Sequence, residues 1–119
     1  MARILFRSKD FSETKRLVKP RAFMPHKGEL SVAELTGLEG MDVLELVQVV
    51  EEHRGLTSKG RGELTVEAVE RTGLRFDRDD HPYDRHGNLL GWPVGPVEKA
   101  RALSIAQELS ASAKFVLHA

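Results

Sequence analysis

Apolar residues recur along the chain at two spacings, one typical of helices and one typical of short strands. The clearest helical stripe lies in residues 42–54 and consists of Val43, Leu46, Val47 and Val50. Asp42 is expected to cap this helix, because Glu45 follows three residues later. Gly55 is expected to end it in a left-handed conformation. The pattern therefore predicts a helix over residues 42–54.

Two further helices are predicted on similar grounds. Thr65 is a capping residue, so we expect a short helix to run from it to Arg71 and to stop at Gly73. Pro96 suits the first turn of a helix, which we expect to extend to about Ala113. The apolar stripe of this last helix consists of Ala102, Ile105, Ala106 and Leu109.

Shorter apolar runs predict four to six strands. The clearest of them are residues 3–7, 63–65, 75–77, 88–92 and 114–118. In the last run, Phe115 and Leu117 are expected to face the core. Residues 17–25 are interrupted by two prolines, which favours an edge strand or an extended segment. Residues 56–62 are expected to form a loop.

Residues 30–32 fit two structures. Leu30, Ser31 and Val32 can form a strand, but Ser31 and Glu34 also match the capping box that begins a helix. Propensity does not decide between the two. In either case the elements are those of an α+β protein. We therefore predict a single domain over residues 1–119, with about three helices packed on a short mixed or antiparallel sheet.

Composition excludes several classes of protein. Of the 119 residues 40% are hydrophobic and 30% are charged, as in ordinary globular domains. The chain contains no cysteine, which excludes disulfides, thiol catalysis and zinc sites built from cysteine. No apolar run approaches the ~18 residues that a membrane span needs, and no secretion signal is recognisable. We expect a cytoplasmic protein without membrane contact or cofactor.

Charge is balanced over the whole chain but not along it. Residues 1–28 contain eight Lys or Arg against Asp10 and Glu13, and the remainder contains ten basic against sixteen acidic residues. The two parts can pair with each other across one fold, or the basic part can face a phosphate or a nucleic acid. The neutral total charge and the single Trp and Tyr argue against a nucleic-acid binder.

Residues 77–93 combine four Asp and two His with the only Tyr and the only Trp of the chain. Such a segment can ligate a metal, bind an organic molecule or a protein, or form a solvated loop whose Asp side chains satisfy turns. Asp77 and Asp79 resemble the start of a calcium-binding loop, but Pro82 stands where that loop needs glycine. We therefore assign no metal ligands, and all three readings of the segment stay open.

Two basic loops are candidates for binding an anion. Arg21 and His26 lie in the first, and Arg61 lies between two glycines in the second. The second loop lacks the Gly-Lys-Ser/Thr ending of a P-loop. No nucleophile elbow is present, so hydrolysis by a serine triad is unsupported at this stage. No histidine in the sequence is an evident partner for Ser31, Ser104 or Ser110.

Several short motifs are spread over most of the chain. They are Ala22-Phe23-x-Pro25, Leu30-Ser31-Val32, Gly62-x-Leu64-Thr65-Val66 and Pro82-x3-His86. In this order they resemble a group of small bacterial proteins of unknown function. The resemblance implies that residues 30–32 are extended and that the protein is bacterial and cytosolic, acting beside operon partners. It implies no activity, cofactor or site.

The main functional hypothesis is a small accessory or binding protein that works through a protein partner. A complete small domain without a recognisable catalytic set favours it. Trp92, between Gly91 and Pro93, is either part of the core or an exposed interface anchor. The expected binding face consists of Arg21, His26, His81, His86 and Trp92.

The alternative is an enzyme that acts on a phosphate-bearing or nucleotide substrate. His86 would be the general acid or base, because an unperturbed histidine titrates near neutral pH. Asp84 or Asp80 would orient it, and Arg21 and Arg61 would clamp the anion. This hypothesis requires Arg21 and His86 to line one pocket. The oligomeric state stays open, since an edge strand near residues 17–23 permits a dimer without requiring one.

Overall fold

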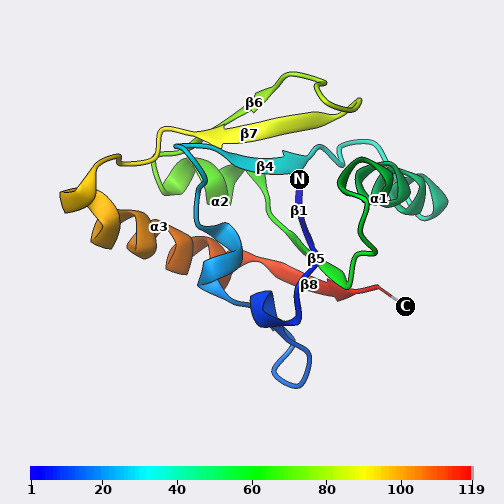
Figure 1. The fold of residues 1–119 in the computed structure, drawn as a ribbon, viewed down its shortest axis with the longest axis horizontal. Helices are drawn as coiled ribbons and strands as arrows, with labels where there is room; N and C mark the ends of the chain where they lie inside the picture. Colours follow the sequence, from blue (N-terminus) through cyan, green and yellow to red (C-terminus); the bar gives the residue numbers. More distant parts are fainter. Residues whose placement is uncertain (119) are drawn as a thin grey trace.

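The computed structural model, which describes residues 1–118, is built around a six-stranded sheet in the order β6-β7-β4-β1-β5-β8 (Figure 1). Its strands are β1 (Ala2–Leu5), β4 (Leu30–Ala33), β5 (Gly60–Glu63), β6 (Arg75–Arg78), β7 (His86–Leu90) and β8 (Lys114–Leu117). Each neighbouring pair in this sheet is antiparallel. A short hairpin of β2 (Phe11–Ser12) and β3 (Leu17–Val18) forms a second, two-stranded sheet.

Three α-helices and three 3₁₀ turns complete residues 1–118. They are α1 (Met41–Arg54), α2 (Val66–Arg71), α3 (Lys99–Ser112), η1 (Ser8–Asp10), η2 (Pro20–Phe23) and η3 (Pro96–Glu98). The prediction of one small α+β domain with about three helices is confirmed. Strands are more numerous than predicted: residues 1–118 contain eight, six of them in the main sheet, and they dominate the fold. The two-residue strands β2 and β3 are too short to show an alternating pattern in the sequence.

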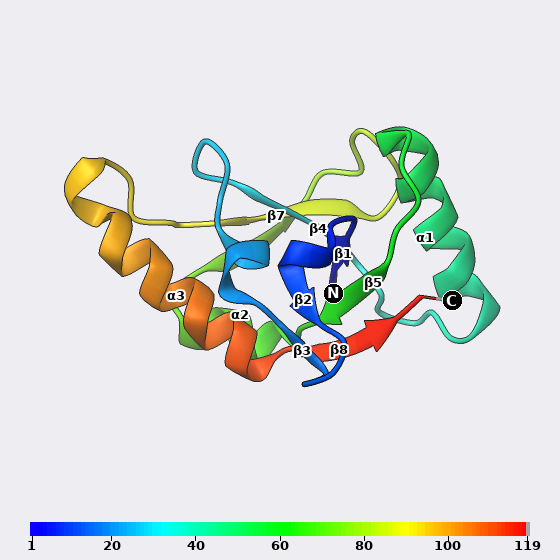
Figure 2. The ribbon, with the colours of Figure 1, turned by 60° about the horizontal axis from the view of Figure 1, so that its bottom comes forward.

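Two hydrophobic clusters cover opposite faces of β1, because successive side chains of a strand point to opposite sides. Leu5 belongs to the larger cluster, which includes buried residues of α2 and α3. Ala2 and Ile4 belong to the smaller cluster, which α1 completes with Val47 and Val50. Figure 2 shows α2 and α3 lying together at one end of the domain and α1 at the other. The sheet therefore carries a thick core on one face and a thinner layer on the other.

β5 begins earlier than the sequence predicts, at residues where a loop was expected. Its glycines are required by close packing, which the sequence pattern does not reveal. A Cβ at Gly60 would lie 2.9 Å from both the Phe115 ring and the main-chain oxygen of Val116. A Cβ at Gly62 would lie 2.9 Å from Cγ2 of Val18. Pairing with β1 on one side and β8 on the other makes this segment a strand, although glycine disfavours strands.

The two readings of residues 30–32 are resolved in favour of a strand, which pairs with β7 along its whole length. The prediction that Thr65 caps α2 is confirmed, since its Oγ1 accepts a hydrogen bond from the Ala68 N–H at 3.1 Å. The predicted cap of α1 is wrong. Gly40 occupies the N-cap position, and Asp42 lies inside the first turn.

The terminal strand carries one core residue instead of the predicted two. Phe115 is buried and stacks on Phe11, with 5.1 Å between ring centroids. Leu117, by contrast, is 39% exposed and lines a surface pocket.

The close packing of β7 against β6 leads to a stability prediction. Gly87 lies against the ring of Phe76, and a Cβ there would lie 2.8 Å from the main-chain oxygen of Asp77. We expect Gly87→Ala to lower the free energy of unfolding by about 1–3 kcal/mol, the range typical of overpacking. Urea denaturation followed by Trp92 fluorescence measures this change. Glu52→Ala is the control, because Glu52 is an exposed residue of α1, and it should shift the free energy of unfolding by less than about 0.5 kcal/mol. Equal midpoints for both variants would contradict the packing.

Candidate functional site

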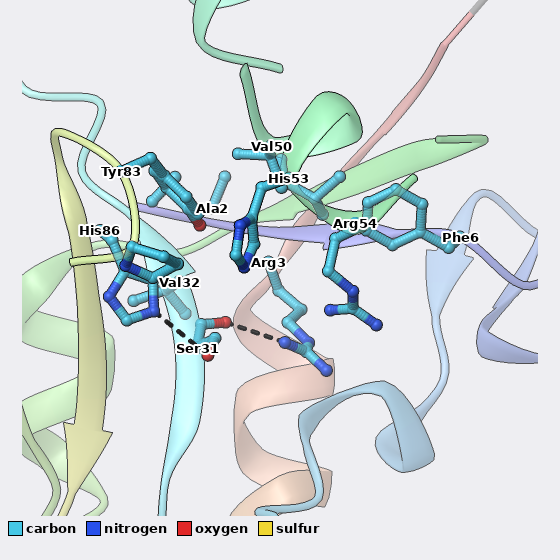
Figure 3. A pocket seen from close by; sticks show the side chains of 13 residues that line it. Ala2, Arg3, Phe6, Ser31, Val32, Val50, His53, Arg54, Tyr83 and His86 are labelled. Carbon is cyan, nitrogen blue, oxygen red and sulfur yellow. Dashed lines mark hydrogen bonds between the residues drawn. The ribbon is translucent and has the colours of Figure 1, made fainter. Parts of the chain in front are cut away.

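A cavity lies where the two central strands of the sheet separate. Within residues 1–118, β1 and β4 pair only at Ala2 and Ala33, whereas β1 pairs with β5 at four positions. A central cavity of about 140 Å³ opens beyond that single pairing, between the sheet, the last turn of α1 and the loop before β7. Its polar lining consists of Arg3, Ser31, His53, Arg54, Tyr83 and His86 (Figure 3).

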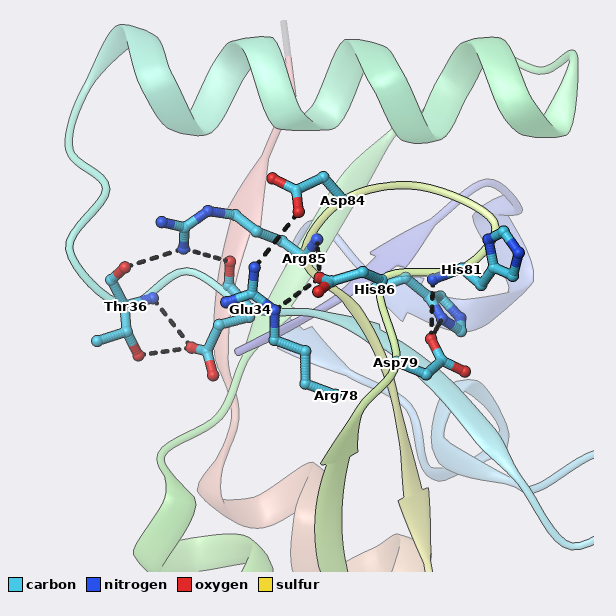
Figure 4. A network of polar contacts seen from close by, with 9 residues as sticks. Glu34, Thr36, Arg78, Asp79, His81, Asp84, Arg85 and His86 are labelled. Carbon is cyan, nitrogen blue, oxygen red and sulfur yellow. Dashed lines mark hydrogen bonds and ion pairs between the residues drawn. The ribbon is translucent and has the colours of Figure 1, made fainter.

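Asp79, His86 and Ser31 form a hydrogen-bonded row at this cavity. Nδ1 of His86 lies 2.7 Å from Oδ1 of Asp79, and Nε2 lies 3.3 Å from Oγ of Ser31 (Figures 3 and 4). An ionised Asp79 accepts the proton of Nδ1, which leaves Nε2 of the neutral imidazole to accept the Ser31 hydroxyl. His86 is buried, whereas 41% of the Asp79 side chain is exposed. The imidazole is therefore oriented as a base toward the hydroxyl.

Asp79 is itself held in place by several donors. The hydrogen bond from His86 and, next, the one from the main-chain N–H of His81 lower the pKa of Asp79 from its ordinary value of 3.8. Nδ2 of Asn88 lies 3.4 Å from the second carboxylate oxygen. Asp79 is therefore ionised at neutral pH. Both of its carboxylate oxygens have hydrogen-bond partners in the β6–β7 loop or in β7.

The acidic segment between β6 and β7 is a loop that supports itself (Figure 4). Asp80 accepts the main-chain N–H of Arg85 at 2.8 Å and pairs with Arg78 at 2.7 Å. Arg85 in turn donates to the main-chain oxygen of Thr36 at 2.9 Å, which ties the loop to the segment after β4. These contacts fix the two ends of the loop, where Asp79 and His86 lie.

Two arginines give the central cavity its positive charge. Arg3 donates from Nε to the main-chain oxygen of Ala22 at 3.1 Å and from Nη1 to that of Ser31 at 2.9 Å. Both acceptors are neutral, and no carboxylate within residues 1–118 forms an ion pair with Arg3 or Arg54. Burial and then the charge of Arg54 lower the pKa of Arg3. An anion entering the cavity would meet two uncompensated guanidinium groups.

Aromatic side chains complete the walls. Tyr83 packs edge-on against His86, with 5.1 Å between ring centroids, and lies 5.9 Å from the ring of His53. Burial raises the pKa of Tyr83, so its hydroxyl stays protonated at neutral pH. Cζ of Arg54 lies 5.0 Å over the Phe6 ring, a cation–π contact that holds this guanidinium at the rim of the cavity.

Of the residues that the sequence singled out, His86 lines the central cavity and the basic candidates do not. Arg21 lines an adjoining groove and pairs with Asp10 at 3.3 Å. His26 lines a third groove. Arg61 lies on β5, where it binds Glu63 at 2.8 Å and approaches Nε2 of His118 at 3.1 Å. Arg21 and His86 therefore line different cavities, so the requirement of the enzyme hypothesis with Arg21 and Arg61 as the anion clamp is not met. The arginines that line the cavity of His86 are Arg3 and Arg54.

The remaining predicted residues have other roles. His81 is exposed, and its main-chain N–H binds Asp79. The Asp84 side chain is 82% exposed and pairs with Arg78 at 3.4 Å; Asp79, rather than Asp84 or Asp80, orients His86. Trp92 is 5% exposed and donates from Nε1 to the main-chain oxygen of Leu89 at 3.0 Å. It is a core residue and not an exposed anchor.

Sequence reasoning missed Ser31, Arg3 and Arg54 as site residues and named Asp79 only as part of the acidic segment. Ser31 and His86 are 55 positions apart, so no local motif joins them. One signal was available: Arg3 stands between Ala2 and Ile4 in an apolar run, and a charged side chain at the centre of a buried strand is rare.

Two further features are absent from the part of the chain that the structure describes. No group of three or more His, Asp or Glu side chains is arranged there to hold a metal ion. None of its helices combines the length and apolarity needed to cross a membrane.

Comparison of the chain with protein-family models, with curated proteins and with solved structures found no match. The site therefore has to be interpreted from its own geometry and chemistry.

The hydrogen bonds of Asp79 predict a pH-dependent contribution to stability. Because folding lowers its pKa, the carboxylate stabilises the folded state above its ordinary pKa of 3.8, and this contribution is lost as pH falls through the lower folded-state pKa. We expect Asp79→Asn to lower the free energy of unfolding at neutral pH, and the difference from wild type to shrink by about pH 3. Urea denaturation at both pH values measures it.

Asp84→Asn is the matched control, because Asp84 lies in the same loop, its side chain is 82% exposed, and its ion pair with Arg78 is long, at 3.4 Å. We expect little change from this variant at either pH. A loss for Asp79→Asn that is the same at neutral and acidic pH would show that the carboxylate charge is not what stabilises the loop.

Proposed function

We propose that this protein is an enzyme that hydrolyses or transfers a phosphate ester, with His86 as general acid and base and Ser31 as nucleophile. The observation that carries the proposal is the row from Asp79 through His86 to Ser31, beside two arginines without carboxylate partners in residues 1–118. A histidine held by a carboxylate on one nitrogen and facing a hydroxyl with the other is typical of nucleophilic catalysis.

The proposed reaction has two halves. The Ser31 hydroxyl gives its proton to Nε2 of His86 while Oγ attacks the phosphorus of the ester, and the departing alcohol takes that proton from His86. Water then gives a proton to His86 and attacks the phosphoserine, which releases phosphate and returns the proton to Ser31. Asp79 keeps its charge throughout and stabilises the imidazolium that forms in each half.

Arg3 and Arg54 favour a phosphate ester over a carboxylic ester. A phosphate ester is anionic before the reaction, and its non-bridging oxygens carry charge through the transition state, where guanidinium groups stabilise it. The carboxylic ester of a neutral substrate would leave two positive charges in the cavity without a partner.

The reaction predicts a clear difference between variants. Ser31→Ala and His86→Gln should each slow the release of nitrophenol from p-nitrophenyl phosphate and bis(p-nitrophenyl) phosphate by about 100-fold or more, since each removes a group that moves a proton or attacks. His81→Gln should retain wild-type activity, because His81 is exposed and contributes only its main-chain N–H to Asp79. Turnover by Ser31→Ala at the wild-type rate would refute its role as nucleophile.

We also propose, as a second candidate, an accessory role through a protein partner. The segment after Trp92 favours it, because Val94 is 71% exposed and Val97 is 87% exposed there. Large apolar side chains exposed together are common at protein interfaces. The lack of cysteine and the resemblance to small bacterial proteins support a bacterial cytosol as the setting for either function.

The partner proposal predicts that binding depends on this segment. A wild-type bait should retain a partner protein that the double variant Val94→Ser, Val97→Ser does not retain. Leu56→Ser is the matched control, because Leu56 is also exposed, at 53%, but follows α1 on another part of the chain. Equal capture by the wild type and the double variant would remove this surface from consideration.

A further inference from the structure

The central cavity is too small to hold a whole substrate. Its volume of about 140 Å³ lies below the ~300–1,000 Å³ typical of small-molecule sites. The reacting group can enter it, but the rest of the substrate must lie in an adjoining depression. Two such depressions exist among residues 1–118, and both share Arg3 and Arg54 with the central cavity. These two arginines therefore line all three spaces, and Figure 3 shows them at the central cavity.

The first depression, here called the arginine groove, has a volume of about 410 Å³. Its charged lining consists of Arg3, Arg7, Arg21, Arg54 and Asp10. The only carboxylate among them, Asp10, is engaged by Arg21 at 3.3 Å. Arg7 is exposed and forms no ion pair with any residue in 1–118. The groove thus keeps a surplus of positive charge in an accessible space next to Ser31 and His86.

The second depression is less suited to an anion. Its volume is about 320 Å³, and its lining adds His26 and Glu29 to the two shared arginines. Glu29 forms no ion pair within residues 1–118. Its negative charge therefore faces this space. Met24 and Leu30 contribute apolar surface. An anionic extension of the substrate is therefore favoured in the arginine groove.

We propose that the arginine groove is a second phosphate subsite, so that the substrate is a diphosphate ester. The inference rests on the proposed function. The terminal phosphate lies at Ser31 and His86 in the central cavity, and the phosphate that bears the ester lies against Arg7 in the groove. Attack of Ser31 on the terminal phosphorus breaks the P–O–P bond, and the monophosphate ester departs in place of the alcohol, taking the proton from His86. Arg3 and Arg54, which line both spaces, contact the two phosphates together.

A small diphosphate fits these observations better than a nucleic acid does. The chain has no net charge, and the positive surplus is confined to one groove of limited volume instead of a long stripe. Base-stacking platforms for a strand would need exposed aromatic side chains along the groove, and Phe6, its aromatic residue, is already covered by Arg54.

The test compares inorganic phosphate with pyrophosphate, and AMP with ADP, by isothermal titration calorimetry on the wild type, Arg7→Gln and Arg71→Gln. In the wild type we expect each diphosphate to bind about tenfold more tightly than its monophosphate counterpart, or more, as charge-assisted hydrogen bonds allow. Arg7→Gln should remove most of that advantage and leave monophosphate affinity within about twofold. Arg71→Gln, which removes the same charge on α2 outside the three spaces, should bind all four probes like the wild type.

The outcomes separate this inference from the proposed function. Equal affinity for mono- and diphosphates in the wild type, or an equal loss of both in Arg7→Gln, would overturn the second subsite and leave the enzymatic proposal standing. Absence of binding for all four probes would overturn both. A single-stranded oligonucleotide that binds more tightly than pyrophosphate, and loses affinity in Arg7→Gln, would replace the diphosphate by a nucleic acid and overturn the inference.

Discussion

The separation of β1 from β4 is the constraint on which the rest of this structure depends. The two strands meet at one residue pair, and beyond it Arg3 binds the main-chain oxygens of Ala22 and Ser31. The bond to Ser31 replaces part of the ladder that β1 and β4 would form in a continuous sheet, where unpaired backbone groups are costly. A polar opening is thereby stable in the middle of the sheet, and side chains of the neighbouring strands line it.

The β6–β7 hairpin and β4 present complementary groups at that opening. The hairpin loop fixes Asp79 and His86, and the register between β7 and β4 brings Ser31 within reach of the imidazole. A one-residue slip of that register would turn Ser31 to the opposite face of the sheet. The alignment is secured by Leu30 and Leu89, which are paired across the two strands and buried in the larger cluster. Core packing on one face therefore sets the geometry of the polar site on the other.

Patterns in the sequence predicted those elements that depend on interactions between residues a few positions apart. The stripe of Leu46, Val47 and Val50 and the cap at Thr65 depend on residues a few positions apart, and both appear as expected. His86 was recognised as a candidate, but its partners were not, because the contact to Ser31 and the position of Arg3 arise from strand order. The start of β5 was missed for a related reason: Gly60 and Gly62, which were expected in a loop, pack against Phe115 and Val18, which are distant in sequence. Trp92 was left open between core and surface, and the fold places it in the core.

The close approaches at glycine offer a criterion for finding relatives of this chain. Gly60, Gly62 and Gly87 are required by packing alone, since a methyl group at any of them would collide with a neighbouring side chain or main-chain oxygen. The proposed reaction requires Ser31, Asp79 and His86, and Asp79 also stabilises the loop that holds it. The residues that preserve the fold and the residues that serve the proposed reaction are thus different sets. A homologue that keeps the glycines but lacks the serine and histidine would share the architecture without the residues that the proposed reaction needs. Retention of both sets would indicate that the activity was inherited with the fold.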